Sequence, residues 1–153
     1  TVGRCLGAER EQVLRAVALS DLVTVHVKEK IGKLSALCGC GIGASIGACC
    51  GILYLRGAGL DVMAAAIRNM VADISGIICD GGKAGCALKI ATAVRSACRC
   101  ARLAEKHHSA DGMNGIVSDD IEQTLNNLGR LVKQGMGVTD DVVLNIMVSK
   151  NAC

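Results

Sequence analysis

The sequence contains no proline, phenylalanine or tryptophan, and Tyr54 is its only aromatic residue. A single ring gives too few stacking platforms for a protein that binds nucleic acid mainly through the bases. The formal charge of +3, from 17 basic and 14 acidic residues, is spread along the chain, so it forms no basic stripe for a phosphate backbone. These absences exclude nucleic-acid binding as the main function.

The missing residue types also restrict the fold. Hydrophobic residues make up 51% of the chain, mostly alanine and aliphatic side chains, and 19 residues are glycine. This composition favours closely packed helices over a β-sandwich or a barrel. A chain of 153 residues is long enough for one compact core and short for two. We therefore expect one all-α domain over residues 1–153, whose core is filled by small side chains.

The start of the chain lacks the pattern of a secretory signal, which is a basic stretch, an apolar segment and a small-residue cleavage site. We therefore expect a cytoplasmic protein. The first residue is Thr1 rather than a methionine, which suggests that the sequence is part of a longer protein.

Ten cysteines could form a disulfide framework, but their positions argue against one. Disulfide scaffolds hold together short, loop-rich chains with small cores, whereas these cysteines lie in long apolar runs and two of them, Cys49 and Cys50, are neighbours. Reduced thiols are the better interpretation.

One long segment, Ala36–Leu55, carries no charge, and its glycines recur every four residues. Such a spacing places Gly39, Gly43, Gly47 and Gly51 on one face of a helix. The length also suits a membrane span, but the segment is rich in glycine, serine and cysteine rather than leucine and isoleucine. We expect a central buried helix whose glycines let neighbouring backbones approach closely, and no membrane span.

Apolar residues at helical spacing predict further helices on both sides of this segment. Capping residues and turn signals set the expected starts. The predicted ranges are Ala8–Lys33 as one helix or two, from Asp61 to about Gly76, Lys83–His107, from a capping box of Asp119 and Glu122 to about Gln134, and a last helix capped by Thr139.

Cys79 and Cys86 lie seven residues apart, which on one continuous helix would separate them by about 10 Å. The turn Asp80-Gly81-Gly82 breaks the chain, so Cys79 at a helix end and Cys86 in the first turn of the next helix can converge. The N-terminus of a helix also favours the thiolate form. Buried cysteines with no ligand role are common, so this spacing leaves metal binding and inert thiols both open.

Three stretches together resemble the serine dehydratase alpha-chain family. They are Cys38–Ala48, Asn69–Lys89 and Asn114–Asp120, and the most specific block is Cys79-Asp-Gly-Gly-Lys-Ala-Gly-Cys-Ala-Leu-Lys89. The similarity extends from about Val25 to Lys150, and the closest branch resembles the L-cysteine desulfidases and their uncharacterised relatives.

The resemblance implies an oxygen-sensitive 4Fe-4S cluster held by three cysteines, with one iron open as a Lewis acid. Matching the motifs assigns the ligands to Cys40, Cys79 and Cys86, with Cys38 as an alternative to Cys40. The implied reaction is α,β-elimination of L-cysteine or L-serine to pyruvate and ammonia, with sulfide as a further product of cysteine.

The remaining site residues are assigned around the substrate, a small amino acid. Lys83 and Lys89 are candidate catalytic residues that could hold its carboxylate, and Asn69 could hydrogen-bond it; solvated helix positions are the alternative for both lysines. Cys153 could reach the open iron because chain termini are mobile.

Family members carry an N-terminal portion with its own cysteine motif, and nothing in this sequence corresponds to it. We therefore expect the chain to be the C-terminal portion of an enzyme, with the missing N-terminal portion as its partner. Whether copies of the chain form a homo-oligomer stays open.

Two other functions compete with the lyase. One is a helical structural or assembly domain whose cysteines only pack in the core. The other is a structural zinc site, which normally needs four ligands where only three are nominated. Convergence of three sulfur atoms would favour the cluster.

Overall fold

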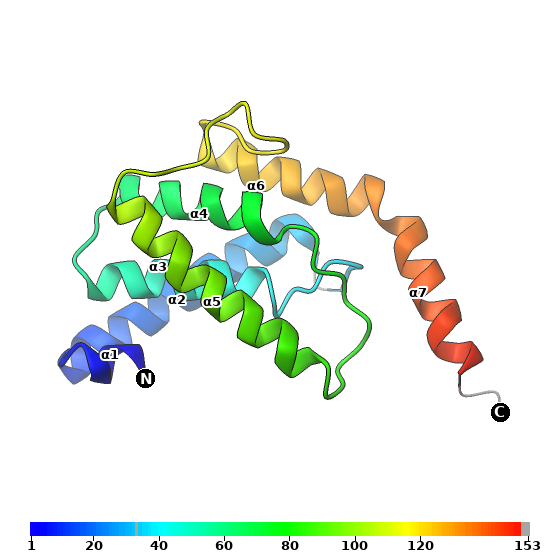
Figure 1. Cartoon of the computed structure of the whole chain (residues 1–153), viewed down its shortest axis with the longest axis horizontal. Coiled ribbons are helices and arrows are strands. Elements are labelled where there is room, and N and C mark those ends of the chain that lie inside the picture. The colour runs from blue at the N-terminus through cyan, green and yellow to red at the C-terminus, as the bar shows by residue number, and fades with distance from the viewer. Residues whose placement is uncertain (33, 151–153) are drawn as a thin grey trace.

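The computed structural model describes residues 1–32 and 34–150, and over these residues the chain is all-α, as the sequence predicts. Backbone pairing between extended segments is limited, in these two ranges, to one antiparallel bridge between Leu37 and Ile78. Figure 1 shows the arrangement of the helices, which are α1 (Val2–Cys5), α2 (Arg10–Ile31), α3 (Gly43–Leu55), α4 (Leu60–Ile74), α5 (Cys86–Glu105), α6 (Ile121–Arg130), a π-helical turn η1 (Leu131–Gly135) and α7 (Gly137–Ser149).

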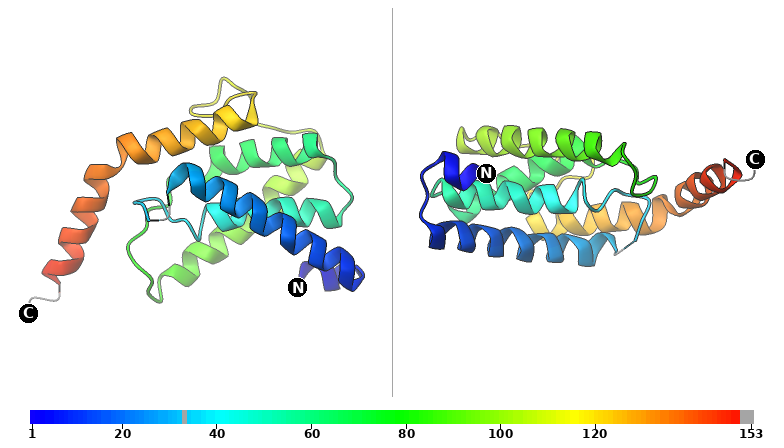
Figure 2. Two further views of the ribbon diagram at one scale, coloured as in Figure 1. Left: turned by 180° about the vertical axis from the view of Figure 1, so that it is seen from behind. Right: turned by 90° about the horizontal axis from the view of Figure 1, so that it is seen from below.

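Helix α3 occupies the centre of the molecule, as expected for the uncharged segment. Seen from below, it lies between α2 and α5 (Figure 2). Its side chains Ile46, Cys49 and Leu53 are fully buried. They belong to a core that also includes Met70 of α4 and Ala97 of α5. Small side chains fill much of this core, in agreement with the missing large aromatic residues.

The helix begins later than the sequence suggests, because Ala36–Ile42 is a loop with the bridge at Leu37. Gly39 therefore lies outside the helix, and the expected face of four glycines is reduced to Gly43, Gly47 and Gly51. The sequence of this segment contains no signal for the start of a helix that would have indicated the later beginning of α3.

The remaining glycine face packs against the backbone of α2. A methyl group built on Gly51 would lie 2.9 Å from the carbonyl oxygen of Ala16. A methyl carbon built on Gly47 would lie still closer to the carbonyl oxygen of Ser20. Real Cβ atoms essentially never come within 3.0 Å of such an atom. The absence of a side chain at these two positions therefore allows the contact of α2 with α3.

The starts of two predicted helices are corrected by one or two residues. Gly59 is the N-cap of α4, so Asp61 lies in the first turn and makes no capping hydrogen bond. Asp120, rather than Asp119, caps α6, where its Oδ1 accepts a hydrogen bond from the backbone N–H of Gln123 at 2.7 Å. Asp119 instead accepts a hydrogen bond from the N–H of Gly112 at 2.9 Å.

The other boundaries differ by similar amounts. Helix α2 is one helix with a capping box formed by Glu9 and Gln12, and its predicted end at Lys33 lies outside the described residues. Helix α7 begins at Gly137, so Thr139 lies in its first turn and not at its cap.

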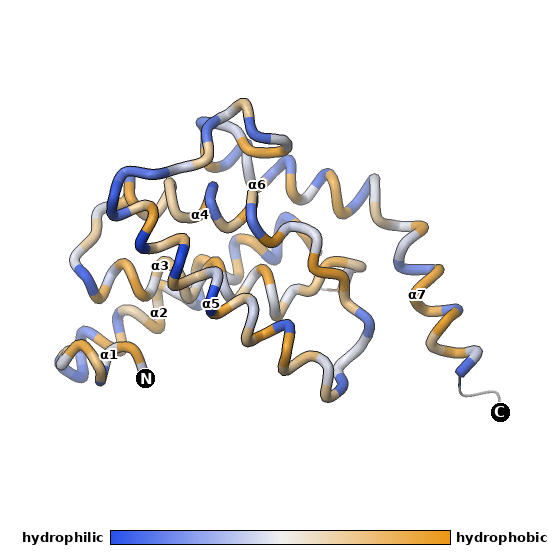
Figure 3. The backbone as a smooth tube through the Cα atoms, viewed as in Figure 1, coloured by the Kyte–Doolittle hydropathy of each residue, from blue (hydrophilic) through white to orange (hydrophobic). Residues whose placement is uncertain are grey.

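Helix α6 continues through η1 into α7, which extends away from the other helices (Figure 1). Leu125 and Leu128 of α6 are buried in the core, whereas no residue of α7 is buried. Figure 3 shows that α7 nevertheless carries apolar residues along its length. None of the helices in the described ranges is both long enough and apolar enough to cross a lipid bilayer.

The glycine contact leads to a stability prediction. We expect Gly47→Ala to lower the free energy of unfolding by about 1–3 kcal/mol, the usual cost of overpacking, because α2 must move away from α3. Gly137→Ala is the control, since a Cβ there meets nothing within 4 Å. Urea unfolding followed by circular dichroism measures both variants. Equal stability of the two variants would contradict the close contact.

Candidate functional site

Two loops that are distant in the sequence meet at one end of the core. The backbone N–H of Cys38 donates to the carbonyl oxygen of Ile77 at 2.8 Å, and the N–H of Cys79 donates to that of Ala36 at 2.6 Å. Both views of the ribbon show the loop before α3 running beside the loop between α4 and α5 (Figures 1 and 2). These two hydrogen bonds bring the predicted ligand loops together.

The cysteines of the two loops differ in exposure. Cys38 is buried, Cys40 is exposed, and Cys79 and Cys86 are half-buried. The Sγ of Cys38 accepts a hydrogen bond from the N–H of Gly41 at 3.3 Å. Burial raises the pKa of the Cys38 thiol above its usual value, and the charges of Cys79, Cys86 and Cys40 raise it further. Cys38 therefore lies within electrostatic reach of all three predicted ligands.

Cys86 is the first residue of α5 and so lies in the first helical turn, as the sequence predicts, although the helix begins three residues after the predicted start at Lys83. Its thiol donates to the carbonyl oxygen of Gly81 at a sulfur–oxygen distance of 3.7 Å. The backbone N–H groups of Cys86, Ala87 and Leu88 are bonded to the carbonyl oxygens of the three residues from Lys83 to Gly85. These three N–H groups at the start of α5 are therefore not free to donate to a thiolate.

Cys79 does not lie at a helix end, because α4 ends five residues earlier, at Ile74. It lies directly after the bridge residue Ile78, in a loop that turns at Gly81, whose φ is +92°. Cys79 is thus positioned by the bridge and this turn rather than by a helix end, and its convergence with Cys86 stays a prediction.

Within the described ranges, no three His, Cys, Asp or Glu side chains are close enough to hold one metal ion. The described residues therefore form no four-ligand zinc site. A 4Fe-4S cluster makes a different demand, because each thiolate binds a different iron and the sulfur atoms stay further apart. The expected convergence of the sulfur atoms of Cys40, Cys79 and Cys86 on one centre is not seen in the described residues, and their role as cluster ligands stays a prediction.

The predicted lysines differ in their surroundings. The Nζ of Lys89 donates to the carbonyl oxygen of Ile78 at 2.8 Å and forms an ion pair with Asp80. The hydrogen bond that Lys89 donates to the carboxylate of Asp80 raises the pKa of Lys89 above its usual value. Lys83 is exposed on the loop between the two cysteines. Lys89 therefore fixes the loop that carries Cys79, and Lys83 is the more accessible of the two ammonium groups.

Sequence reasoning missed a third lysine beside the loops. The half-buried side chain of Lys28 runs along Gly43 and Gly39, and its Nζ would lie 4.0 Å from a Cβ built on Gly39. No ion pair to Lys28 forms in the part of the chain that the structure describes. A positive charge thus lies next to the segment that contains Cys40. In the sequence it was one of many charges on the polar face of an amphipathic helix.

Asn69 has a structural role. Its Nδ2 donates to the carbonyl oxygen of His108 at 2.9 Å, and its Oδ1 accepts from the N–H of Ala110 at 2.8 Å. The side chain is 9% exposed and links α4 to the segment after α5. Its binding of substrate stays a prediction, as do the roles of Lys83 and Lys89.

Other cysteines are part of the core. Cys49, Cys50 and Cys100 are buried, and the thiol of Cys49 donates to the carbonyl oxygen of Ala97 at 3.3 Å. Burial raises the pKa of Cys50 to about 12 and raises that of Cys49 as well. These three thiols match the alternative of buried cysteines with no ligand role. Cys153 lies outside the described residues.

The comparisons with known proteins give one family model and several relatives. The family model of the serine dehydratase alpha chain matches residues 1–145. A UPF0597 protein of Clostridium perfringens is 46% identical over 147 residues, which cover 96% of this chain and 34% of that protein. A UPF0597 protein of Clostridioides difficile is 45% identical over 141 residues, covering 92% and 33%. The chain spans about a third of the length of the curated relatives it matches. No solved structure gives a significant match.

The exposure of the thiols predicts their order of alkylation. In the reduced, metal-free chain, we expect iodoacetamide to modify Cys40 and Cys5 first and Cys79 and Cys86 next, with Cys49 much slower, because burial removes access and raises its pKa. Peptide mass spectrometry over a time course measures each rate. Protection of Cys40 equal to that of Cys49 would contradict the described loop.

Proposed function

Because the chain belongs to the serine dehydratase alpha chain family, we propose that it holds a 4Fe-4S cluster through Cys40, Cys79 and Cys86. We further propose that it is part of a lyase that eliminates water from L-serine or hydrogen sulfide from L-cysteine. The observation that supports the proposal is the bridge between Leu37 and Ile78, which joins the two cysteine loops.

The proposed ligands differ from the core thiols in a way that suits metal binding. Cys40, Cys79 and Cys86 keep part of their surface exposed, whereas Cys49 and Cys50 are buried. A ligand must lose its proton, and an accessible thiol does so at a lower cost than a buried one. A cluster with three protein ligands leaves one iron open, and an open metal site can polarise a leaving hydroxyl or thiol.

The lysines supply positive charge around the proposed ligands. Lys28 lies beside the loop of Cys40, and Lys89 lies near Cys38 and Cys86, whose negative charges raise its pKa in addition to the larger effect of Asp80. Both ammonium groups would offset the charge of thiolates. Lys83 has no ion pair within residues 1–32 and 34–150, so it is the lysine we assign to the substrate carboxylate.

Elimination also requires a base that removes the α-proton of the substrate, and no residue of this chain is assigned to that step. The curated relatives are about three times as long as the matched segment. We propose that the base and the rest of the substrate pocket come from an N-terminal portion that this chain lacks. The aminoacrylate that elimination releases hydrolyses to pyruvate and ammonia. A cytoplasmic location fits because free thiols persist there.

Iron and acid-labile sulfide per chain test the proposed ligands. After anaerobic reconstitution, we expect equal amounts of iron and sulfide in the unaltered chain and a loss of both in Cys40→Ser, Cys79→Ser and Cys86→Ser. Cys5→Ser is the matched control, because Cys5 is exposed like Cys40 but lies in α1. Cys38→Ser decides between the two candidate ligands of the first loop.

Retention of iron in Cys40→Ser together with its loss in Cys38→Ser would move the assignment to Cys38. If the unaltered chain takes up neither iron nor sulfide, the proposal of a self-sufficient cluster domain is wrong. The cysteines would then have a packing role in a helical assembly domain.

The elimination reaction is tested in a chimera in which this chain replaces the matching third of the Clostridium perfringens relative. We expect the chimera to release pyruvate from L-cysteine or L-serine under anaerobic conditions. Cys79→Ser should reduce the rate to background, because one iron would lose its ligand, while Cys5→Ser should keep it. Pyruvate is measured by coupling to lactate dehydrogenase. Full activity of Cys79→Ser would exclude a cluster-dependent reaction.

A further inference from the structure

Helix α7 exposes apolar side chains on opposite faces. Seven of its 13 residues are aliphatic or methionine, and no residue of the helix is buried. Five of the apolar side chains are each at least 49% exposed, namely those of Val138, Val142, Leu144, Ile146 and Val148. Val138, Val142 and Ile146 follow one another at intervals of four residues and share one face, whereas Leu144 and Val148 lie on another. A helix that is apolar all round is normally buried inside a larger protein or a membrane.

Neither a lipid surface nor a single partner helix suits α7. Helices that lie on membranes carry lysine and arginine on a polar face, whereas the charged residues of α7 are two aspartates, Asp140 and Asp141. Two paired helices bury only the stripe between them, so a single partner helix would leave the opposite apolar face of α7 exposed. The helix therefore fits a groove in a larger body of protein, whose walls contact it from at least two sides.

Helix α7 also borders the loop that carries Cys79. A Cβ built on Gly81 would lie 2.9 Å from the Cε of Met147, so the methyl group of Met147 rests on the turn between Cys79 and Cys86. Val143, one helical turn earlier, is half-buried like Met147. In the front and rear views, α7 leaves the other helices at the end of the molecule where this loop lies (Figures 1 and 2). A body seated on α7 would therefore lie beside the proposed cluster ligands.

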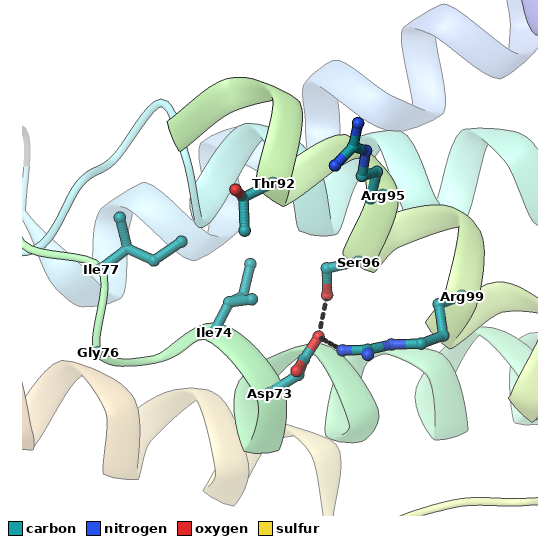
Figure 4. Close-up of a pocket in the computed structure, with 8 residues that line it drawn as sticks. All are labelled: Asp73, Ile74, Gly76, Ile77, Thr92, Arg95, Ser96 and Arg99. Atoms are coloured by element: carbon teal, nitrogen blue, oxygen red, sulfur yellow. Dashed lines mark hydrogen bonds and ion pairs between the residues drawn. The ribbon is translucent and has the colours of Figure 1, made fainter. Parts of the chain in front are cut away.

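The segment from Ile77 to Gly81 has a polar neighbour at its other end. Ile77 lines a pocket between α4 and α5 whose wall includes Asp73, Ser96 and Arg99 (Figure 4). The carboxylate of Asp73 accepts hydrogen bonds from both Ser96 and Arg99. Covering these polar groups with an apolar surface would cost desolvation free energy. Helix α7 is thus the more suitable side of the loop for an apolar partner.

We propose that α7 is the docking surface for the portion of the longer protein that this chain lacks, and that this portion encloses α7 in an apolar groove beside the loop of Cys79. The matched segment makes up 34% of the Clostridium perfringens relative, so about two thirds of that protein lie outside it. A body of that size can enclose a helix that is about 20 Å long. The docking needs neither a cluster nor a substrate. One consequence rests on the proposed function: a portion seated there lies where it can bring its base to the substrate.

Hydrogen exchange followed by mass spectrometry tests the docking in the metal-free state. The isolated chain is compared with the chimera in which it replaces the matching third of the Clostridium perfringens relative. In the isolated chain we expect fast exchange throughout α7, because a 13-residue helix with no buried residue opens readily. In the chimera we expect its amides to exchange at least about tenfold more slowly, because the helix must first leave the groove. Protection of α3, whose side chains form the core, shows in both proteins that the chain is folded.

A pair of matched variants locates the surface. Leu144→Lys on α7 and Leu14→Lys on α2 each replace a leucine that is 58% exposed. The positive charge introduced at position 144 lies one turn after Asp140, and this pairing favours the helical form of α7. In the chimera we expect Leu144→Lys to accelerate the exchange of α7 about tenfold or more, because a charge cannot enter an apolar groove without a large cost. Leu14→Lys should leave the exchange of α7 unchanged.

The proposal is overturned if α7 exchanges equally fast in the isolated chain and in the chimera, or if the two variants change its exchange equally. It is also overturned if α7 of the isolated chain is protected at high protein concentration and loses this protection on dilution, because the occupant is then a second copy. A chimera that binds no iron or releases no pyruvate contradicts the proposed function alone, since exchange in the metal-free state depends on neither.

Discussion

The close contact of α3 with α2 is the constraint on which the rest of the structure depends. Gly47 and Gly51 each cost backbone entropy, about 0.5–1 kcal/mol relative to alanine in a helix, and the packing of two backbones must offset this cost. Gly129 of α6 makes a similar contact, since a Cβ there would lie 2.6 Å from the carbonyl oxygen of Lys30. Helix α2 is thus the element that two glycine-bearing helices approach. A core built in this way needs no large aromatic side chain, and the position of α3 also determines where the loop of Cys40 begins.

The sequence was sufficient for the fold class and for the central place of α3, because hydrophobic periodicity and an uncharged segment are strong signals. It was less informative about where helices start. Asp119 and Asp120 are both capping candidates in the sequence, and only the folded chain decides between them. The N–H of Gly112 donates to Asp119, whereas the N–H of Gln123 at the start of α6 donates to Asp120. Gly39 continues the spacing of the other glycines, yet the bridge at Leu37 keeps its segment out of the helix.

The candidate site could be predicted only in part. A turn between Cys79 and Cys86 follows from the glycines at 81 and 82. The bridge between Leu37 and Ile78 brings the loop before α3 to the loop of Cys79. It joins residues 41 positions apart, and neither segment has the pattern of a β-strand, so a single sequence could not predict it. Lys28 was missed for a different reason: half-burial beside Gly39 and Gly43 is a property of packing, and a lysine on an amphipathic helix otherwise indicates a solvated face.

The π-helical turn η1 separates α6, which packs against the core, from α7, which has no buried residue. A π-helical turn contains more residues than an α-helical one, so it rotates the apolar side chains that follow relative to those that precede it. Leu128 and Val132 accordingly face the core, whereas Val142 and Ile146 are half exposed. Met136, a bend between η1 and α7, completes this change of direction. Five π-helical residues and one bend thus separate a helix that packs in the core from one whose apolar side chains stay exposed.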